Sequence, residues 1–345
     1  MDIRIVDPGL YPQWNELILD NFDPDIFHSA EWCQVLKSSY KLRPIYFVAS
    51  EARKPVAIIP LAEARSSLTG NRGVSLPFSD YCHFLESNED SWHSLLEPIL
   101  TYGRKMKWKY CEFRSLKFIS DATPSEMFYT HDLDLTRPTD ILWTNLKNSC
   151  RRNIKKASRE GVKIRFDKSW PGLEQFYRLQ VMTRKRHGLP PQPLIFFKNL
   201  YENIISKNLG IIASAYSQHK IIASSIYLNF NHKALFKYGA SDARYHHLRP
   251  NNLMMWEAIN WHRENNCRQM NLGRTERDNT GLLNYKRQWG GKEYCLNYHR
   301  FDFEIGSYAK NMERQLMAFW PSQLARLLPD CLFKFSGKIL YKHIS

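Results

Sequence analysis

Two pairs of short apolar segments, one pair in each half of the chain, most constrain the fold. Segments 44–49 and 55–61 flank a short polar turn, and 210–216 and 220–230 repeat this arrangement. Segments of this length joined by tight polar turns predict antiparallel β-hairpins. Because amphipathic helical patterns alternate with these and further strands, the sequence predicts an α/β fold with mixed sheets of the α+β type. The two similar hairpins also suggest a duplicated unit.

The chain has 345 residues, which favours two domains. We predict an N-terminal domain over 1–130 and a second α/β domain over 139–303. The segment 120–138 has little apolar pattern and contains two prolines, so we interpret it as a connection. A single helix is expected to begin at Thr139, with apolar residues spaced three and four apart.

The last part of the chain, 304–345, differs in character. Trp320 and several leucines lie among basic residues that include Arg314, and prolines at 321 and 329 interrupt the segment. This pattern predicts a basic amphipathic tail made of short helices.

Several enzyme classes lack their sequence signatures here. Seven dispersed cysteines form no C-x-x-C pair, which is typical of reduced thiols in a cytosol. The chain has no H-E-x-x-H, P-loop, G-x-G-x-x-G or G-x-S-x-G motif, so we expect no metal site, nucleotide hydrolysis or hydride transfer. Its first residues do not resemble a signal peptide, and no apolar run is long enough to cross a membrane, so we expect a cytoplasmic location.

A strongly basic segment covers Lys147–Arg165. It contains eight basic residues and one acidic residue, and the whole chain has a formal net charge of +15. Basic residues spaced four apart form a ridge on the predicted helix. The ridge is either a solvated helix face or a contact surface for phosphate or nucleic acid, for which the candidates are Arg151, Arg152, Lys155 and Lys156.

A second candidate region joins a strand to a buried helix. The strand ends near Tyr238 and Asp242, and Pro250 occupies the first position of the helix. A helix N-terminus offers free backbone N–H groups that suit a phosphate, and Arg244 and Arg249 add positive charge. Many strand–loop–helix units have this shape, so a purely structural role stays open.

A third region contains Gly273-Arg274 at a strand end and Tyr285-Lys286 on a short helix. In a cleft, Lys286 could balance the oxyanion that develops during acyl transfer. The alternative is an ordinary solvent-exposed lysine. We expect Trp289 to pack in the core.

Together these segments resemble FemAB-like proteins of the GNAT acyltransferase superfamily. In the second half the resemblance rests on Gly239-Ala240-Ser241-Asp242, Pro250-Asn251-Asn252-Leu253, Trp256-Glu257-Ala258-Ile259, Leu272-Gly273-Arg274, Tyr285-Lys286 and Trp289-Gly290. Further similar segments are Trp32, Ile59-Pro60-Leu61, Ser75-Leu76-Pro77-Phe78, Arg151–Ala157, Gly161-Val162, Arg184, His187–Pro190 and Phe196-Phe197. The resemblance covers about residues 25–300.

The resemblance implies two tandem GNAT-like subdomains with a cleft between them. It implies transfer of an acyl or aminoacyl group to an amino group, with acyl-CoA or aminoacyl-tRNA as co-substrate and no permanently bound cofactor. Acceptors in the family are often cell-envelope precursors, as in peptidoglycan bridging or exopolysaccharide systems. The aromatic–lysine pair of the family's donor channel matches Tyr285-Lys286.

We therefore interpret Lys286 as the oxyanion-stabilising residue and either Asp242 or Glu276 as the base that takes the amine proton. The expected donor-binding residues are Tyr238, Arg244, Arg249, Asn251, Asn252, Arg274 and Tyr285. Arg184 and His187 would contact the acceptor.

Two other functions stay open at this stage. The net charge and the basic ridge also fit a non-catalytic tRNA- or RNA-binding protein. The tail, residues 307–345, also fits a peripheral membrane scaffold, because basic amphipathic helices bind anionic membrane surfaces. Membrane contact is compatible with an enzyme as well, and the alternative for the tail is packing on the core.

Overall fold

The computed structural model describes the whole chain except residues 68, 89–90, 116–122, 310–321, 342 and 344–345. The chain divides into two units. Unit 1 comprises Met1–Phe128, Cys295–Ala318 and Tyr341–Ser345, and unit 2 comprises Tyr129–Tyr294 and Phe319–Leu340. The division falls inside two strands, β9 (Glu126–Asp134) and β16 (Lys292–Asp302).

Unit 1 contains strands of two sheets. The first sheet has the order β1-β3-β4-β7, with its strands at Asp2–Val6, Tyr46–Glu51, Lys54–Ile59 and Leu85–Glu86. The second is a 13-stranded sheet, of which this part has the order β16-β8-β6-β5-β2, with β8, β6, β5 and β2 at Tyr110–Ser115, Gly70–Val74, Ala62–Ser66 and Arg43–Pro44. The β6–β8 pair is parallel and the β16–β8 pair is antiparallel, so the sheet is mixed. A short strand β17 (Ser307–Tyr308) pairs with β16.

One helix of unit 1 begins at a side-chain cap that the sequence supplies. Ser29 accepts a hydrogen bond from the Trp32 backbone N–H and starts α2 (Ala30–Tyr40), as predicted. The other helices are α1 (Trp14–Asn21), α3 (Leu96–Lys105) and the 3₁₀ turns η1 (Pro8–Leu10), η2 (Ile26–His28) and η3 (Ser91–Leu95). Apolar residues of β3, β4 and α3 form a core with Trp92 and Trp108.

Unit 2 is built on a second run of strands, in the order β10-β11-β12-β13-β14-β9-β16. New strands here are β10 (Lys163–Asp167), β11 (Gly210–Ser217), β12 (Lys220–Phe230), β13 (Lys233–Ser241) and β14 (Gln269–Asn271), and β15 (Thr275–Glu276) pairs with β9. β10 to β13 pair antiparallel in sequence order, whereas β13 and β14 are parallel. This arrangement confirms the predicted mixed α/β class.

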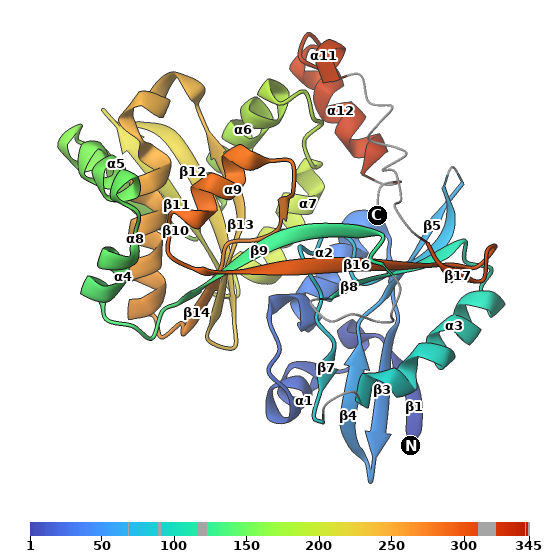
Figure 1. Ribbon diagram of the computed structural model, residues 1–345. Coiled ribbons are helices and arrows are strands. Elements are labelled where there is room, and N and C mark those ends of the chain that lie inside the picture. The colour runs from blue at the N-terminus through green and yellow to red at the C-terminus, as the bar shows by residue number, and fades with distance from the viewer. Residues whose placement is uncertain (68, 89–90, 116–122, 310–321, 342, 344–345) are drawn as a thin grey trace. The chain divides into compact units, whose positions relative to one another are not determined.

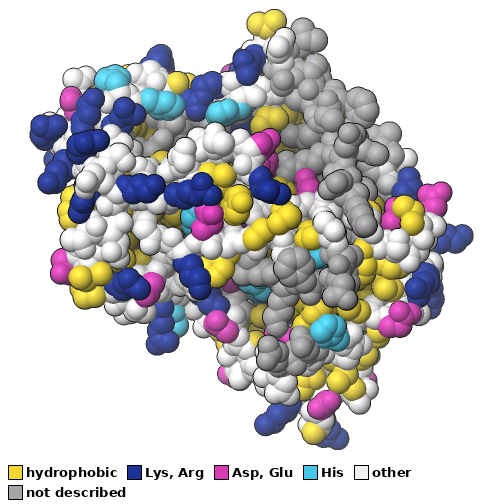
Figure 2. All heavy atoms as spheres, in the orientation of Figure 1, with side chains coloured by type: hydrophobic (Ala, Val, Ile, Leu, Met, Phe, Trp, Pro, Cys, Tyr) yellow, Lys and Arg dark blue, Asp and Glu magenta, His cyan; other side chains and the backbone are white. Residues whose placement is uncertain are grey.

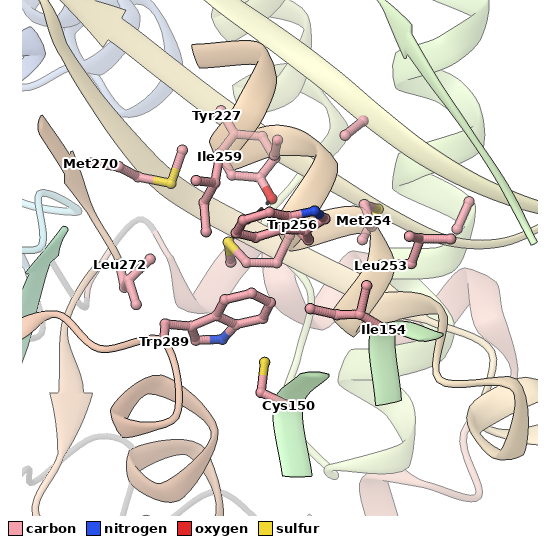
Figure 3. Packing of buried hydrophobic residues seen from close by; sticks show 14 of the residues in the cluster. Cys150, Ile154, Tyr227, Leu253, Met254, Trp256, Ile259, Met270, Leu272 and Trp289 are labelled. Carbon is pink, nitrogen blue, oxygen red and sulfur yellow. Dashed lines mark hydrogen bonds between the residues drawn. The ribbon is translucent and has the colours of Figure 1, made fainter. Parts of the chain in front are cut away.

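Helices cover both faces of the unit 2 sheet (Figure 1). The helices α5 (Asn148–Arg159) and α8 (Pro250–Glu264) lie on one side, and α6 (Trp170–Arg186) and α7 (Leu194–Leu200) lie on the other. The remaining helical segments are α4 (Thr139–Asn145), the π-helical turn η4 (Tyr201–Ile205), the 3₁₀ turn η5 (Ala243–Leu248), α9 (Thr280–Arg287), α11 (Ser322–Ala325) and α12 (Asp330–Leu340). In the core, Cys150 and Ile154 of α5 gather with Trp289 around Trp256 and Met254 of α8 (Figure 3).

Two elements differ from the sequence-based expectation. The segment interpreted as a connection contains β9, which includes buried Thr130 and His131 and therefore lacks a clear apolar alternation. The single helix expected from Thr139 is two helices, because Leu146 and Lys147 are extended and the Lys147 backbone N–H bonds to the Gln288 carbonyl.

The C-terminal part also divides differently from the predicted ranges. Residues 295–303 group with unit 1 because β16 pairs with β8, and 319–340 group with unit 2. Arg314 and Trp320, noted in the sequence, lie outside the described residues. Within the described part of the chain, no helix is both long and apolar enough to span a membrane, and no cluster of His, Cys, Asp or Glu could hold a metal.

Candidate active site

The candidate site of unit 2 lies where two parallel strands separate. β13 and β14 pair over three residues each, from Lys233–Gln269 to Leu235–Asn271. Beyond this point β13 continues to Ser241, whereas the chain after β14 bends at Leu272, whose N–H bonds to the His131 carbonyl. The chain that follows β14 brings Arg274 and α9 to this point.

Lys286 is buried at this strand end. Its side chain comes from the last turn of α9 and is 3% exposed. The Nζ atom donates hydrogen bonds to the carbonyl oxygens of Gly273, at 2.7 Å, and Arg274, at 3.2 Å. The sequence left open whether this lysine is buried or solvent-exposed, and the structure places it inside unit 2 next to Arg274.

A histidine that the sequence analysis did not single out lies in the same region. His131 on β9 is fully buried, and its Nε2 lies 2.9 Å from the Glu293 carboxylate, which also pairs with Arg287. Burial lowers the pKa of His131, Glu293 opposes this change, and the positive charge of Lys286 favours it. Burial thus favours the neutral form of His131. A lone histidine in a poorly patterned segment gives no sequence signal that could have identified it.

The N-terminus of α8 contacts α9 and α5. The Tyr285 hydroxyl donates to the Asn251 carbonyl at 3.2 Å, and burial raises the pKa of Tyr285. The Asn252 side chain lies 3.9 Å from the Cys150 sulfur of α5. Arg249, which precedes α8, is exposed and has a φ of 58°, a left-handed conformation that is unfavourable for arginine. These contacts bring the predicted residues Asn251, Asn252 and Tyr285 together.

Asp242 and Arg244 pair with each other in η5. The Asp242 carboxylate accepts from the Arg244 backbone N–H at 3.1 Å and from its guanidinium at 2.6 Å. These hydrogen bonds hold the pKa of Asp242 below its usual range. Asp242 therefore caps η5 and is a weaker base than a free carboxylate. Glu276, the other candidate base, is half-buried on β15, two residues after Arg274.

Tyr238 lies apart from this group. A bulge in β13 at Lys237 places Phe236 and Tyr238 opposite the adjacent residues Tyr227 and Ile226 of β12, so the two rings point to opposite faces. Phe236 packs on the α8 side, and Tyr238 packs against Phe176, Phe196 and Phe197 of α6 and α7. The Tyr238 ring therefore lies on the face of β13 opposite to α8, and its predicted contact with the donor stays a prediction.

The predicted acceptor residues lie at the end of α6. Arg184 is half-buried and its Nε donates to the Pro190 carbonyl, and His187 is exposed. Hydrogen bonds between Thr183 and the Ser241 backbone tie this end of α6 to the end of β13. Arg184 and the Asp242–Arg244 pair thus belong to neighbouring segments.

The α5 helix presents its basic side chains outward. Lys147, Arg152, Lys155 and Arg159 are exposed, and Arg151 and Lys156 are half-buried. Figure 2 shows dark blue side chains gathered over this part of unit 2. The opposite face of α5 buries Cys150, Ile154 and Ala157 against α8. The same helix therefore contacts the N-terminus of α8 with its buried face and presents basic side chains on its outer face.

Comparison with known families finds two matches. Residues 144–287 match the acetyltransferase (GNAT) domain, and residues 71–215 match the FemAB family. No curated protein matches the chain in sequence.

Solved structures share the fold at low sequence identity. A crystal structure of FemX is 12% identical, covers 86% of this chain and 97% of its own, and has a TM-score of 0.67. L-PGS from Bacillus licheniformis is 12% identical with a TM-score of 0.56, over 92% of this chain and 97% of its own. A tandem GNAT protein from the clavulanic acid biosynthesis pathway is 10% identical with a TM-score of 0.55, over 87% and 98%.

Proposed function

Since the chain is an acyltransferase with GNAT and FemAB domains, we propose that it transfers an acyl or aminoacyl group to an amino group of a cell-envelope or polysaccharide precursor. Peptidoglycan and exopolysaccharide precursors are the acceptor classes that the FemAB resemblance suggests. The donor is acyl-CoA or aminoacyl-tRNA, both of which have a phosphate-bearing tail.

The position of Lys286 carries this proposal. In acyl transfer the amine attacks the donor carbonyl carbon, negative charge develops on the carbonyl oxygen, and the bond to the thiolate or ribose oxygen then breaks. A buried ammonium stabilises such an oxyanion far better than an exposed one, because little water screens it. Lys286 is fixed by the Gly273 and Arg274 carbonyls at the strand end where a donor carbonyl would lie.

The N-terminus of α8 would hold donor phosphates. Backbone N–H groups of Asn251 and Asn252 lie in the first helical turn, where an anion is favoured. Arg249 is exposed immediately before the helix, and the Arg244 side chain is 68% exposed although it pairs with Asp242. The basic face of α5 would continue this contact along a longer polyanion such as tRNA.

The proton of the attacking amine needs an acceptor. We place this role on Glu276 rather than Asp242, because Arg244 already lowers the pKa of the Asp242 carboxyl. His131 and Glu293 act as positioning residues, since Glu293 clamps Arg287 next to Lys286. Arg184 and His187 would contact the acceptor at the end of α6.

The test compares Lys286→Ala with Lys292→Ala, which removes an exposed lysine of the same unit. Transfer is measured with radiolabelled acetyl-CoA and with charged tRNA, using amino sugars and amino-bearing peptides as acceptors. Loss of the oxyanion partner should lower kcat about 10²–10³-fold, and the Lys292 variant should keep full activity. A folded Lys286→Ala protein with undiminished turnover would remove Lys286 from the reaction.

A further inference from the structure

The helix α12 has apolar side chains on two faces, and one of these faces is packed against unit 2. Phe333 is fully buried. A Cβ atom at Gly337 would collide with the Pro191 carbonyl oxygen, so the helix and that loop are in close contact. Asp330 forms an ion pair with Lys185 of α6 at 2.8 Å. These contacts fix which face of α12 points away from unit 2.

The outward face carries large apolar side chains. Leu332, Phe335 and Ile339 are 53%, 57% and 49% exposed, and their spacing of three and four residues places them on one stripe. Leu327, just before the helix, is 81% exposed. Single exposed apolar residues are ordinary, but a stripe of them on one helix marks an interaction surface.

Positive charge lies along one side of this stripe and before the helix. Lys334 and Lys338 are exposed on α12, and Arg326 is exposed before it. Asp330 is the one acidic residue in the sequence from 322 to 341, and Lys185 neutralises it. The Lys334 ammonium lies 6.0 Å from the Tyr177 ring centroid, so its stem runs along the protein surface.

We propose that this outward face of α12 docks on an anionic lipid membrane. An apolar stripe with basic residues beside it matches the boundary between acyl chains and negatively charged headgroups. A second copy of the chain fits less well, because two such faces would bring like charges together. The helix has 11 residues and inserts one stripe, so binding is reversible and depends on anionic lipid. The proposal concerns α12 alone and does not depend on the role of Lys286.

The test measures flotation of the full chain with vesicles of phosphatidylcholine alone or mixed with phosphatidylglycerol. The double variant Phe335→Glu/Ile339→Glu places acids on the stripe and should weaken binding to the mixed vesicles at least tenfold. The control, Leu19→Glu/Ile141→Glu, changes two exposed apolar residues elsewhere, which are 42% and 41% exposed, and should bind like the parent. Lys334→Gln/Lys338→Gln should weaken binding and reduce its dependence on salt.

Each alternative result contradicts the proposal. If the parent chain does not float with anionic vesicles, or if the Phe335/Ile339 variant floats equally well, the face does not bind lipid. If the parent is a dimer that this variant converts to monomer without any lipid binding, the stripe is a protein interface. Near-ultraviolet circular dichroism of each variant establishes that a loss of binding is not a loss of fold.

Discussion

Buried ionisable side chains in this protein are held either charged by partners or neutral by burial. Glu112 on β8 belongs to the first kind, with ion pairs to Arg114 at 2.8 Å and to Arg300 on β16. His262 on α8 belongs to the second kind, because it is fully buried against Tyr227 and Cys267. The two residues lead to different dependences of stability on pH.

Burial opposes ionisation of Glu112, but Arg114 and Arg300 outweigh it and lower the pKa from 4.5 to about 2. The stabilisation is complete above the unfolded pKa of 4.5 and is lost as pH falls towards 2. Glu112→Gln leaves two partly buried arginines without their carboxylate and should cost about 3–5 kcal/mol at pH 7. The free energy of unfolding in urea should also depend less on pH between 4.5 and 2 than it does in the parent. The control is Glu97→Gln, which removes an exposed ion pair with Arg104. An equal effect of this change would contradict the interpretation.

Burial lowers the pKa of His262 from 6.5 to about 3. The unfolded chain therefore binds a proton below pH 6.5 that the folded chain does not, and stability falls as pH drops from 6.5 to 3. Unfolding of His262→Phe should take up one proton fewer in this range, so the free energy of unfolding should change with pH by up to about 1.4 kcal/mol per pH unit less than in the parent. Chemical denaturation across this range measures the slope, and His93→Phe, at an exposed position, should leave it unchanged. An unaltered slope in His262→Phe would mean that the histidine does not titrate on unfolding.

At the scale of single residues, the sequence can indicate which side chains are candidates for the site, but not how buried they are or which partners they have. The resemblance identified Lys286, but its burial depends on where the chain turns after β14. Asp242 was a reasonable base in the sequence, yet its carboxylate is used by Arg244 two residues later. His131 carried no signal, because its partner Glu293 is 162 residues away in the chain and meets it through the sheet.

Among the elements, those with strong local signals were predicted well. The cap at Ser29 set the start of α2, and Pro250 set the start of α8. β9 was missed because it buries the polar residues Thr130 and His131, which breaks the apolar alternation. Neighbouring strands supply partners for their polar atoms, namely Asn271 for Thr130 and Glu293 for His131. The break between α4 and α5 was missed because it depends on a hydrogen bond to the distant Gln288.

Docking of α12 depends on the absence of a side chain at Gly337. Gly337→Ala would place a methyl group against the Pro191 carbonyl, where backbone rather than a flexible side chain must move. We expect a destabilisation of the docked helix of about 1–3 kcal/mol. Hydrogen exchange of the α12 amides should become faster, and Phe333 should become accessible. Ser336→Ala, on the same helix, is the control, since its hydroxyl bonds within α12. Unchanged protection in Gly337→Ala would show that this packing does not hold the helix.

At the scale of the whole molecule, the path of the chain decides which part can fold alone. One large apolar cluster of unit 2 is made of residues between 133 and 289, a continuous stretch, whereas α12 adds the buried Phe333 from further along the chain. Unit 1 instead needs residues 295–302, because β16 pairs with β8 from Asn297–Ser115 to Asp302–Tyr110 and supplies Arg300 to Glu112. The two units should therefore tolerate separation differently.

We expect a fragment of residues 129–294 to unfold cooperatively, because it keeps every residue of the apolar cluster between 133 and 289 and loses only the α11–α12 segment of unit 2. A fragment of residues 1–128 loses the partner strand of β8 and leaves Glu112 with one arginine, so it should be less stable. Joining residues 295–309 to 1–128 through a flexible linker should raise its Tm, since the strand pairing and the Arg300 contact return. Thermal melts followed by circular dichroism compare the three fragments. An unfolded 129–294 fragment would contradict the expectation that this stretch folds alone. Equal melting of 1–128 with and without residues 295–309 would contradict the assignment of β16 residues to unit 1.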